Sequence, residues 1–185
     1  MNFEQKNGEH KIENLLNIII KTDRLILKPV SLDYKGMIFS EFGEDIVKYM
    51  FPSSPKNISD TEDFINKSIQ EMTKGKDLVV SVFNRETNEF LGGGGVHHID
   101  TKTPELGIWI KKSGHGNKYG LEAVRGLKEW AEKNLKYEYL IYPVVKENIP
   151  SRMIPESFGA KVNREFIGKK QDGSEMEEVE YRIYK

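Results

Sequence analysis

Residues 105–124, Glu-Leu-Gly-Ile-Trp-Ile-Lys-Lys-Ser-Gly-His-Gly-Asn-Lys-Tyr-Gly-Leu-Glu-Ala-Val, decide the fold of this chain. The first part, residues 105–112, is rich in aliphatic and aromatic side chains and predicts a strand. Residues 114–120 form a glycine-rich loop, and apolar residues at helical spacing after it predict a helix to residue 135. Such a loop directs several backbone N–H groups at one point, and the helix dipole adds positive potential there. The stretch therefore indicates an anion-binding turn suited to a diphosphate.

Two other interpretations of the loop at 114–120 remain open. A tight turn from a strand into a helix needs glycine for purely structural reasons. A nucleotide-binding loop would carry Gly-Lys-Ser/Thr, which is missing, and a Rossmann fingerprint would lie in a βαβ unit rather than after a series of hairpins. ATP binding is thus the weaker functional interpretation.

Three consecutive strands are predicted up to the loop. Residues 78–83 and 89–99 form two strands around a turn at 84–88, and strand 105–112 follows. The four glycines at 92–95 are unusual inside a strand. Because glycine weakens a strand, this run predicts a bulge or a closely approaching neighbour.

The rest of the chain adds strands and helices in alternation. We interpret residues 1–21 as an N-terminal extension, helical around 12–20, and residues 22–185 as one domain. The mixture of hairpins and helices predicts the α+β class. Further strands are expected at 22–30, 137–145, 161–168 and 176–184, and helices at 31–41, at 44–50, after a cap at Ser59 or Asp60, and from Asn148.

Composition excludes several function classes. Lys and Arg number 28 against 29 Asp and Glu, so there is no basic excess for nucleic acid or an anionic membrane. The absence of cysteine excludes a thiol nucleophile and a thiolate metal site, and no metal is expected. The apolar runs are too short for a membrane span, and no signal peptide is apparent. We therefore expect a cytoplasmic protein.

Four segments occur in the order of one known family: residues 22–30, 105–110, 115–123 and 148–159. By these segments the chain resembles the GNAT-superfamily N-acetyltransferases of the RimJ/RimL type, the ribosomal-protein N-terminal acetyltransferases. The first two are similar to that branch's opening and fourth strands. The third stands where the family has Gln/Arg-x-x-Gly-x-Gly/Ala and then x-Glu-Ala, and the fourth matches its Asn-x-x-Ser helix with a terminal glycine. The resemblance covers residues 22–185.

The resemblance implies a mixed, mostly antiparallel central sheet of about seven strands flanked by helices. It also implies acetyl-CoA as co-substrate and direct transfer of the acetyl group to a primary amine in a ternary complex. The acceptor would be a protein or peptide N-terminus or a small-molecule amine, and a homodimer is a further expectation by analogy. Carried over to this sequence, the co-substrate contacts are Trp109, Ile110, Lys111, His115, Gly116, Asn117, Lys118, Tyr119, Gly120, Asn148 and Ser151.

The same resemblance suggests how the chemistry is divided. Glu105 begins the strand that leads into the loop, and acidic residues on that strand act as base in several GNAT enzymes; a solvated carboxylate is the alternative. Backbone donors at 109–111 would stabilise the oxyanion. Pro155 stands where many members carry a tyrosine proposed as general acid, so Ser151 is the expected donor to the thiolate.

Two loop residues depart from the family pattern. His115 replaces Gln or Arg, and Lys118 replaces glycine. The Lys118 side chain would either attract phosphate or crowd the site. With Pro155, these departures leave an alternative open, a non-catalytic acyl-CoA-binding or sensor module with the same fold. Turnover of acetyl-CoA with any amine would separate the two.

Several other residues admit both a structural and a functional role. His97 and His98 would face opposite sides of their strand, so that one of them points into the acceptor cleft. Glu122 would mainly stabilise a helix N-terminus, and Tyr142 would belong to the core or the cleft wall. Acidic residues of the first helices form a solvated face or favour a cationic acceptor, and an alternating glutamate run faces solvent or a dimer edge. The first set is Glu41, Glu44, Asp45, Asp60, Glu62 and Asp63; the run is Glu175, Glu177, Glu178 and Glu180.

Overall fold

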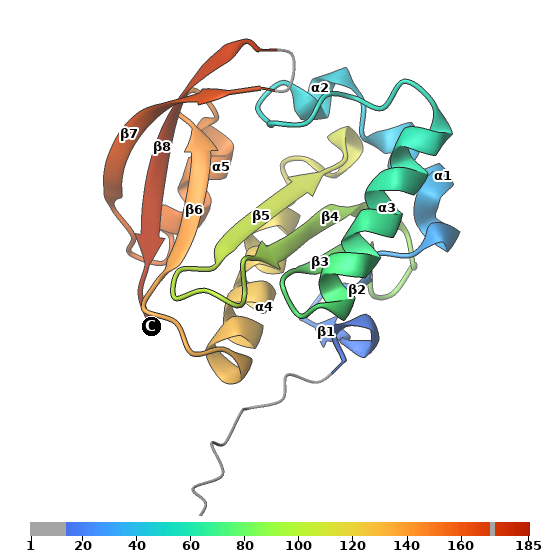
Figure 1. Cartoon of the computed structure of the whole chain (residues 1–185), viewed down its shortest axis with the longest axis horizontal. Coiled ribbons are helices and arrows are strands. Elements are labelled where there is room, and N and C mark those ends of the chain that lie inside the picture. The colour runs from blue at the N-terminus through green and yellow to red at the C-terminus, as the bar shows by residue number, and fades with distance from the viewer. Residues whose placement is uncertain (1–13, 171–172) are drawn as a thin grey trace, which may run out of the picture.

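The computed structural model describes residues 14–170 and 173–185. One sheet of eight strands, in the order β1-β2-β3-β4-β5-β6-β8-β7, runs through the described part (Figure 1). All neighbouring pairs are antiparallel except β5 and β6. The expected fold class is confirmed, with one short strand, β1, in addition to those predicted. The strands are β1 (Ile20–Lys21), β2 (Leu25–Pro29), β3 (Leu78–Asn84), β4 (Phe90–His97), β5 (Glu105–Ile110), β6 (Leu140–Val145), β7 (Val162–Lys169) and β8 (Glu175–Ile183).

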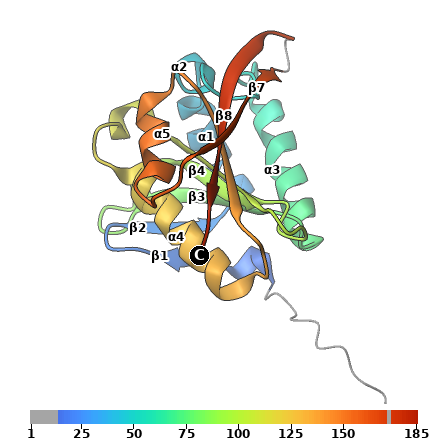
Figure 2. The same cartoon turned by 90° about the vertical axis from the view of Figure 1, so that its left-hand side faces the viewer.

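Helices cover both faces of the sheet. Figure 2 shows α4 and α5 on one side of the strands and α3 on the other. Apolar side chains such as Leu27, Leu127 and Tyr181 join the layers in one core. The helices are α1 (Lys35–Glu41), α2 (Glu44–Val47), α3 (Ile58–Thr73), α4 (Tyr119–Asn134) and α5 (Ile149–Glu156), with 3₁₀ turns η1 (Leu15–Asn17), η2 (Leu32–Tyr34) and η3 (Lys112–Gly114).

The start of α3 differs from the sequence prediction. Asn57, not Ser59 or Asp60, caps the helix, because its side-chain oxygen accepts hydrogen bonds from the backbone N–H groups of both residues. The Asp60 carboxylate accepts in turn from the Asn57 N–H and completes a capping box. Asp60 is therefore inside the helix, with its charge engaged in the cap.

The described part of the N-terminal segment is not the predicted helix. Leu15–Asn17 is a 3₁₀ turn, and Ile20–Lys21 pairs with β2 as the added strand β1. Leu15 and Ile18 lie in the core, so this segment packs against the domain. A two-residue strand leaves no periodicity in the sequence, which is why β1 is missed. Residues 12 and 13 of the predicted helix lie outside the described residues.

The glycine run in β4 forms a bulge and also meets a close neighbour, as predicted. The register between β3 and β4 shifts at Val82 and Phe83, opposite Gly92, whose φ is +155°. A Cβ atom at Gly92 would lie 2.1 Å from the Trp109 carbonyl oxygen on β5. At the other end of the strand, β4 stops at His97 because His98 adopts a left-handed conformation. The close approach of the β4 and β5 backbones depends on Gly92.

The sheet opens between β5 and β6. These parallel strands share a single register pair, Glu105 with Ile141, whereas β4 pairs with β5 along its whole length. Beyond this pair β6 has no strand partner among the described residues on its β5 edge, while its other edge pairs with β8 along the whole strand. Figure 1 shows β5 and β6 diverging toward the end of β5. The edge of β5 from residue 106 to 110 therefore faces an opening in the middle of the sheet.

Candidate active site

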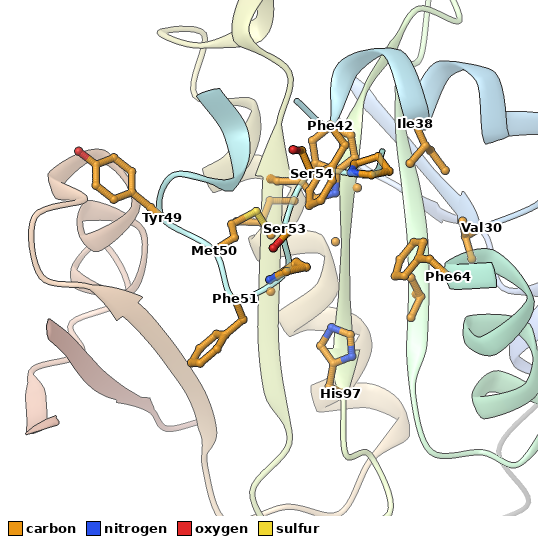
Figure 3. A pocket seen from close by; sticks show the side chains of 18 of the residues that line it. Val30, Ile38, Phe42, Tyr49, Met50, Phe51, Ser53, Ser54, Phe64 and His97 are labelled. Carbon is orange, nitrogen blue, oxygen red and sulfur yellow. The ribbon is translucent and has the colours of Figure 1, made fainter. Parts of the chain in front are cut away.

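A pocket of about 980 Å³ lies at the opening between β5 and β6. Phe42 and Phe64 form an apolar wall on the α3 side, and the segment 49–51 lines the pocket on the opposite side, toward β7 and β8 (Figure 3). Tyr142 from β6 and Ser151 from α5 line the same pocket. A single pocket thus joins groups that belong to the two faces of the sheet.

Glycines of β4 and β5 leave room for two rings on the pocket floor. A Cβ atom at Gly93 would lie 2.9 Å from Trp109 Nε1, and one at Gly95 would lie 3.2 Å from His97 Nε2. Gly107 on β5 leaves similar space, with its Cβ position 3.6 Å from His97 Nε2. The imidazole therefore lies across both backbones, and His97 lines the pocket (Figure 3).

Asp77 orients the His97 ring. Nδ1 of His97 lies 3.6 Å from Asp77 Oδ2, and the other carboxylate oxygen accepts from the His98 N–H. Burial alone would raise the pKa of Asp77, but its contacts with His97 and His98 lower it. The expectation that one histidine points into the cleft is confirmed for His97. His98 lies beyond the end of the strand and is exposed, so the two do not occupy opposite faces of one strand.

Glu105 begins β5 directly opposite His97 and lines the pocket. Burial raises the pKa of the Glu105 carboxyl, and the two nearby histidines offset this only in part. The negative charges of Asp77 and Glu180 raise it further. A carboxylate with a raised pKa in a pocket is suited to accept a proton.

Ser151 and Tyr142 form a hydrogen-bonded pair at the far side of the opening. Their hydroxyl oxygens lie 2.9 Å apart. Burial raises the pKa of Tyr142 to about 12, and the bond with Ser151 opposes this only in part, so the phenol keeps its proton at neutral pH. The side chain of Asn148 caps α5 by accepting from the Ser151 N–H at 3.3 Å. These contacts hold the serine hydroxyl at the pocket.

The glycine-rich loop enters α4 through two left-handed residues, Gly116 with φ of 80° and Lys118 with φ of 60°. The first hydrogen bond within the helix runs from the Glu122 N–H to the Lys118 carbonyl. The N–H groups of residues 119–121 therefore have no acceptor within the helix. Together with the helix dipole, these donors form a site suited to a diphosphate.

The loop's own side chains hold it in place. His115 donates from Nε2 to the Ile110 carbonyl at 2.7 Å. Asn117 donates from Nδ2 to the carbonyls of Gly114 and His115 at 3.3 and 3.2 Å. The His115 and Asn117 side chains are thus structural here, which leaves binding to the backbone donors.

Glu122 ties the start of α4 to β2. Its Oε1 accepts from the Thr22 hydroxyl at 2.5 Å and from the Arg24 N–H at 2.7 Å, and its Oε2 accepts from Arg24 Nε at 2.7 Å. Arg24 also donates to the Asn117 carbonyl at 3.1 Å. Burial alone would raise the pKa of Glu122, but these hydrogen bonds lower it. The structural role expected for Glu122 agrees with these contacts.

The backbone of β5 offers fewer free donors than the three residues expected. The Lys111 N–H donates to the Leu91 carbonyl at 2.8 Å, and its ammonium pairs with Glu89. Because backbone groups alternate along an antiparallel strand, Trp109 also faces β4, whereas the N–H groups of Ile108 and Ile110 point toward the opening. The structure therefore favours Ile110 over Trp109 and Lys111 as the backbone donor beside the loop.

The acidic residues of the first helices do not form a free anionic face. Asp60 is used in the α3 cap, and Asp60 and Asp63 are the two members of the set that line the pocket. Three others are bonded to neighbours: Glu44 to Ser54, Asp45 to Lys112 and Glu62 to Lys35.

Two glutamates of β8 are buried, which contradicts the expectation that the whole run faces solvent or a dimer edge. Glu178 and Glu180 are each 3% exposed, because β8 is an inner strand between β6 and β7. Glu180 is paired with Arg164 and Arg182. Glu178 lines the pocket.

The sequence from residue 24 to residue 161 matches the family model of the acetyltransferase (GNAT) domain. The chain belongs to the GNAT acetyltransferase family. It is an acetyl-CoA-dependent N-acetyltransferase, and the sequence-based recognition is confirmed. No curated protein is significantly similar to it in sequence.

Solved structures of other acetyltransferases share the fold. An acetyltransferase (GNAT family) from Bacillus anthracis is 21% identical, with a TM-score of 0.77 over 90% of this chain and 98% of that one. The Salmonella typhimurium acetyltransferase that modifies the N-terminal serine of ribosomal protein L7/L12 is 12% identical, with a TM-score of 0.79 over 91% and 99%. The microcin C7 self-immunity acetyltransferase MccE, in complex with acetyl-CoA and AMP, is 17% identical, with a TM-score of 0.78 over 89% and 94%.

The residues of this GNAT chain fit acetyl-CoA. The loop at 115–120 and the first turn of α4 supply backbone donors for a diphosphate, and the open edge of β5 lies next to them. Across residues 14–170 and 173–185 no cluster of His, Asp and Glu is arranged to hold a metal ion. No helix within those same ranges is long and apolar enough to cross a membrane.

Two polar groups of the GNAT pocket are not predicted from the sequence. The Tyr142 hydroxyl was assigned to the core or cleft wall, which is correct for the ring but misses its bond to Ser151. Glu178 was grouped with exposed glutamates. The signal that could have found it is the alternation of Val179, Tyr181 and Ile183 with Glu178 and Glu180, which predicts a strand with one face in the core.

Proposed function

We propose that this enzyme transfers the acetyl group of acetyl-CoA directly to a primary amine in a ternary complex, without a covalent enzyme intermediate. The observation that carries the proposal is that one pocket is lined both by Glu105 and by Ser151. An acceptor and a thioester that meet in this pocket have a proton acceptor on one side and a proton donor on the other.

On the acceptor side, Glu105 takes the proton that the amine loses as it attacks. Its raised pKa brings its basicity closer to that of an amine than an exposed glutamate's would be. His97, held by Asp77 and paired across the strands with Glu105, lies next to it. The apolar wall of Phe42 and Phe64 keeps bulk water away from the neutral amine.

On the donor side, acetyl-CoA supplies an activated thioester. The backbone N–H groups at 119–121 bind the diphosphate, and the Ile110 N–H stabilises the negative charge that develops on the acetyl oxygen. The Ser151 hydroxyl gives its proton to the departing sulfur. The Tyr142 phenol, which is protonated at neutral pH, donates a hydrogen bond that stabilises the serine oxygen as it loses this proton, and the serine takes up a proton from solvent after the products leave.

The acceptor is a protein or peptide N-terminus or a small-molecule amine. A Salmonella protein of the same fold modifies an N-terminal serine, which supports a peptide acceptor. The pocket volume of about 980 Å³ supports either class.

The test is an acetyl-CoA-dependent thiol-release assay with peptides and small amines, comparing wild type, Glu105→Gln and Ser151→Ala. We expect thiol release by the wild type and large losses in both variants, while Glu86→Gln, an exposed turn residue, keeps full activity. Binding of acetyl-CoA without release of thiol with any amine would overturn the proposal and favour a non-catalytic acyl-CoA-binding module.

A further inference from the structure

Among the residues that the structure describes, 14–170 and 173–185, the buried carboxylate of Glu178 has no partner. It is 3% exposed, and its Oε2 atom is fully buried and has no hydrogen-bond partner. Glu180, two residues along the same face of β8, is equally buried but is bonded to Arg164, Arg182 and Asn163. Because an unpaired buried carboxylate destabilises a folded chain, the contrast indicates that the partner of Glu178 comes from outside the described residues.

Gly168 on β7 leaves the space in which the Glu178 carboxylate lies. A Cβ atom at Gly168 on β7 would lie 2.0 Å from Glu178 Oε2 and 3.2 Å from the Phe51 ring. Gly168 does not have a left-handed φ, so its backbone conformation does not require glycine. The role of the glycine is to leave room for a neighbouring side chain. The carboxylate therefore occupies the space beside β7 that the missing side chain of Gly168 leaves, and a side chain at 168 would displace it.

The lysines at the ends of the neighbouring strands β6 and β7 already have other partners. Lys146 pairs with Glu165 and Glu177, and Lys170 donates to the carbonyls of Val47 and Lys48. Within residues 14–170 and 173–185, Lys56 and Lys67 also line the pocket, but neither forms an ion pair with Glu178. Burial raises the pKa of Glu178, and the negative charge of the Glu105 carboxylate raises it further.

We propose that Glu178 binds a second positively charged group of the acceptor, so that the preferred substrate is an amine carrying another ammonium or guanidinium group near the one that is acetylated. The inference rests on the proposed function and deepens it. Glu105 receives the proton of the reacting amine, and Glu178, in the same pocket, neutralises the distal cation. A diamine and a peptide with a basic side chain near its N-terminus both present this chemistry.

A purely structural role would give the opposite stability effect. If Glu178 supported the fold, Glu178→Gln would lower the melting temperature. Because the carboxylate is buried and unpaired, we expect Glu178→Gln to raise the melting temperature while it weakens binding of the dicationic acceptor. A gain in stability with a loss of substrate recognition is the signature of a binding residue.

The experiment compares matched acceptors: 1,5-diaminopentane with 1-aminopentane, and the peptide amide Ser-Lys-Ala with Ser-norleucine-Ala. We expect wild type to prefer the dication of each pair by about 10- to 100-fold in kcat/KM, the range of one charge-assisted contact. In Glu178→Gln that ratio falls toward one, mainly through KM. Glu177→Gln, the exposed neighbour on β8, keeps the wild-type ratio. The two pairs also distinguish a small diamine from a basic peptide.

Each outcome decides the inference separately from the proposed function. A wild-type ratio near one, or a ratio that Glu178→Gln leaves intact, would overturn the role of Glu178 even if the enzyme acetylates amines. If wild type acetylates none of the four acceptors, the proposed function fails for these amines. Calorimetric titration with 1,5-diaminopentane in the presence of CoA then tests Glu178 alone. Binding that disappears in Glu178→Gln supports the site, whereas absent or equal binding overturns it. Gly168→Ala, which fills the space beside β7, is expected to act in the same direction as Glu178→Gln.

Discussion

The loop side and the acceptor side of the pocket are stabilised in opposite ways. On the loop side, the carboxylate of Glu122 receives three hydrogen bonds from Thr22 and Arg24, and the side chains of the loop bond to its own carbonyls. On the acceptor side, Glu178 has no partner in the part of the chain that the structure describes, and burial raises its pKa. The polar side chains of the first region are satisfied without a ligand, and only its backbone donors at 119–121 await one, while the second region holds an uncompensated side-chain charge. The difference teaches that donor binding is pre-organised and that acceptor choice is left to the incoming molecule.

The largest expected effect tests the acceptor side. Glu105→Gln removes the proton acceptor, so we expect kcat to fall by about 10²- to 10⁴-fold, the range for loss of a general base. Because the pKa of Glu105 is raised, the wild-type rate climbs with pH as this carboxyl ionises, and that limb of the pH profile should vanish in the variant. Affinity for acetyl-CoA, measured by calorimetry, should stay the same. An unaltered pH profile would remove Glu105 as the base.

The next effect concerns the hydroxyl pair. Ser151→Ala should lower kcat by about 10- to 100-fold and leave the Kd of acetyl-CoA within about threefold, because the hydroxyl acts on the departing sulfur. The variant also leaves the buried Tyr142 hydroxyl without its partner, so stability should fall by about 1–2 kcal/mol. The double variant with Tyr142→Phe should recover part of that stability but none of the rate. Equal losses in rate and in acetyl-CoA affinity would contradict the thiolate role.

On the loop side, Glu122→Gln should act on binding and stability rather than on chemistry. It weakens the charge-assisted bonds from Arg24, whose guanidinium is about half exposed, so solvent screening limits the loss to about 1–2 kcal/mol. The Kd for acetyl-CoA should rise several-fold, and kcat at saturating acetyl-CoA should change little. Chemical denaturation and calorimetry measure the two effects, and Glu129→Gln on the exposed side of α4 is the control. A large fall in kcat would assign Glu122 a role in the chemistry.

The uncompensated charge of Glu178 also predicts a pH dependence of stability. Burial raises the pKa of this carboxyl in the folded chain above its unfolded value near 4.5. The free energy of unfolding is therefore highest below pH 4.5, where the carboxyl is protonated in both states, and it falls as pH rises through the folded pKa. Unfolding curves of wild type and Glu178→Gln should therefore coincide near pH 4 and separate by about 1 kcal/mol at pH 7, with the variant more stable. A variant that is less stable at pH 7 would contradict the absence of a partner.

The smallest effect is expected at Lys118. This residue holds a left-handed backbone conformation with φ of 60°, which glycine adopts without strain. Lys118→Gly should therefore be neutral or stabilise the enzyme by up to about 1 kcal/mol, with little change in the Kd of acetyl-CoA. A large loss of acetyl-CoA affinity would show instead that the Lys118 ammonium binds the diphosphate.

The sequence predicts the loop side of the pocket better than the acceptor side. The strand at 105–110, the loop and α4 follow from glycine spacing and apolar periodicity, because these are local signals. The Asn57 cap and the two-residue β1 are missed because caps can shift by two residues and short strands have no period. The burial of Glu178 is missed because it depends on the strands that flank β8, which are β6 and β7, and on the missing side chain of Gly168. None of these is visible in the residues next to Glu178. Local chemistry is predictable here, and the chemistry made by long-range packing is not.

The single register pair between β5 and β6 has a consequence for hydrogen exchange. Central strands of a sheet are normally the last to exchange their amide hydrogens with heavy water, because opening them requires global unfolding. The amides of Ile108 and Ile110 lie in the middle of this sheet but point into its opening, so they should take up deuterium long before those of β3 or β8. In hydrogen exchange the protein should behave as two half-sheets with fast-exchanging amides between them. A ligand bound in the opening should slow the exchange of these amides, so their exchange rate reports ligand occupancy without an assay of turnover.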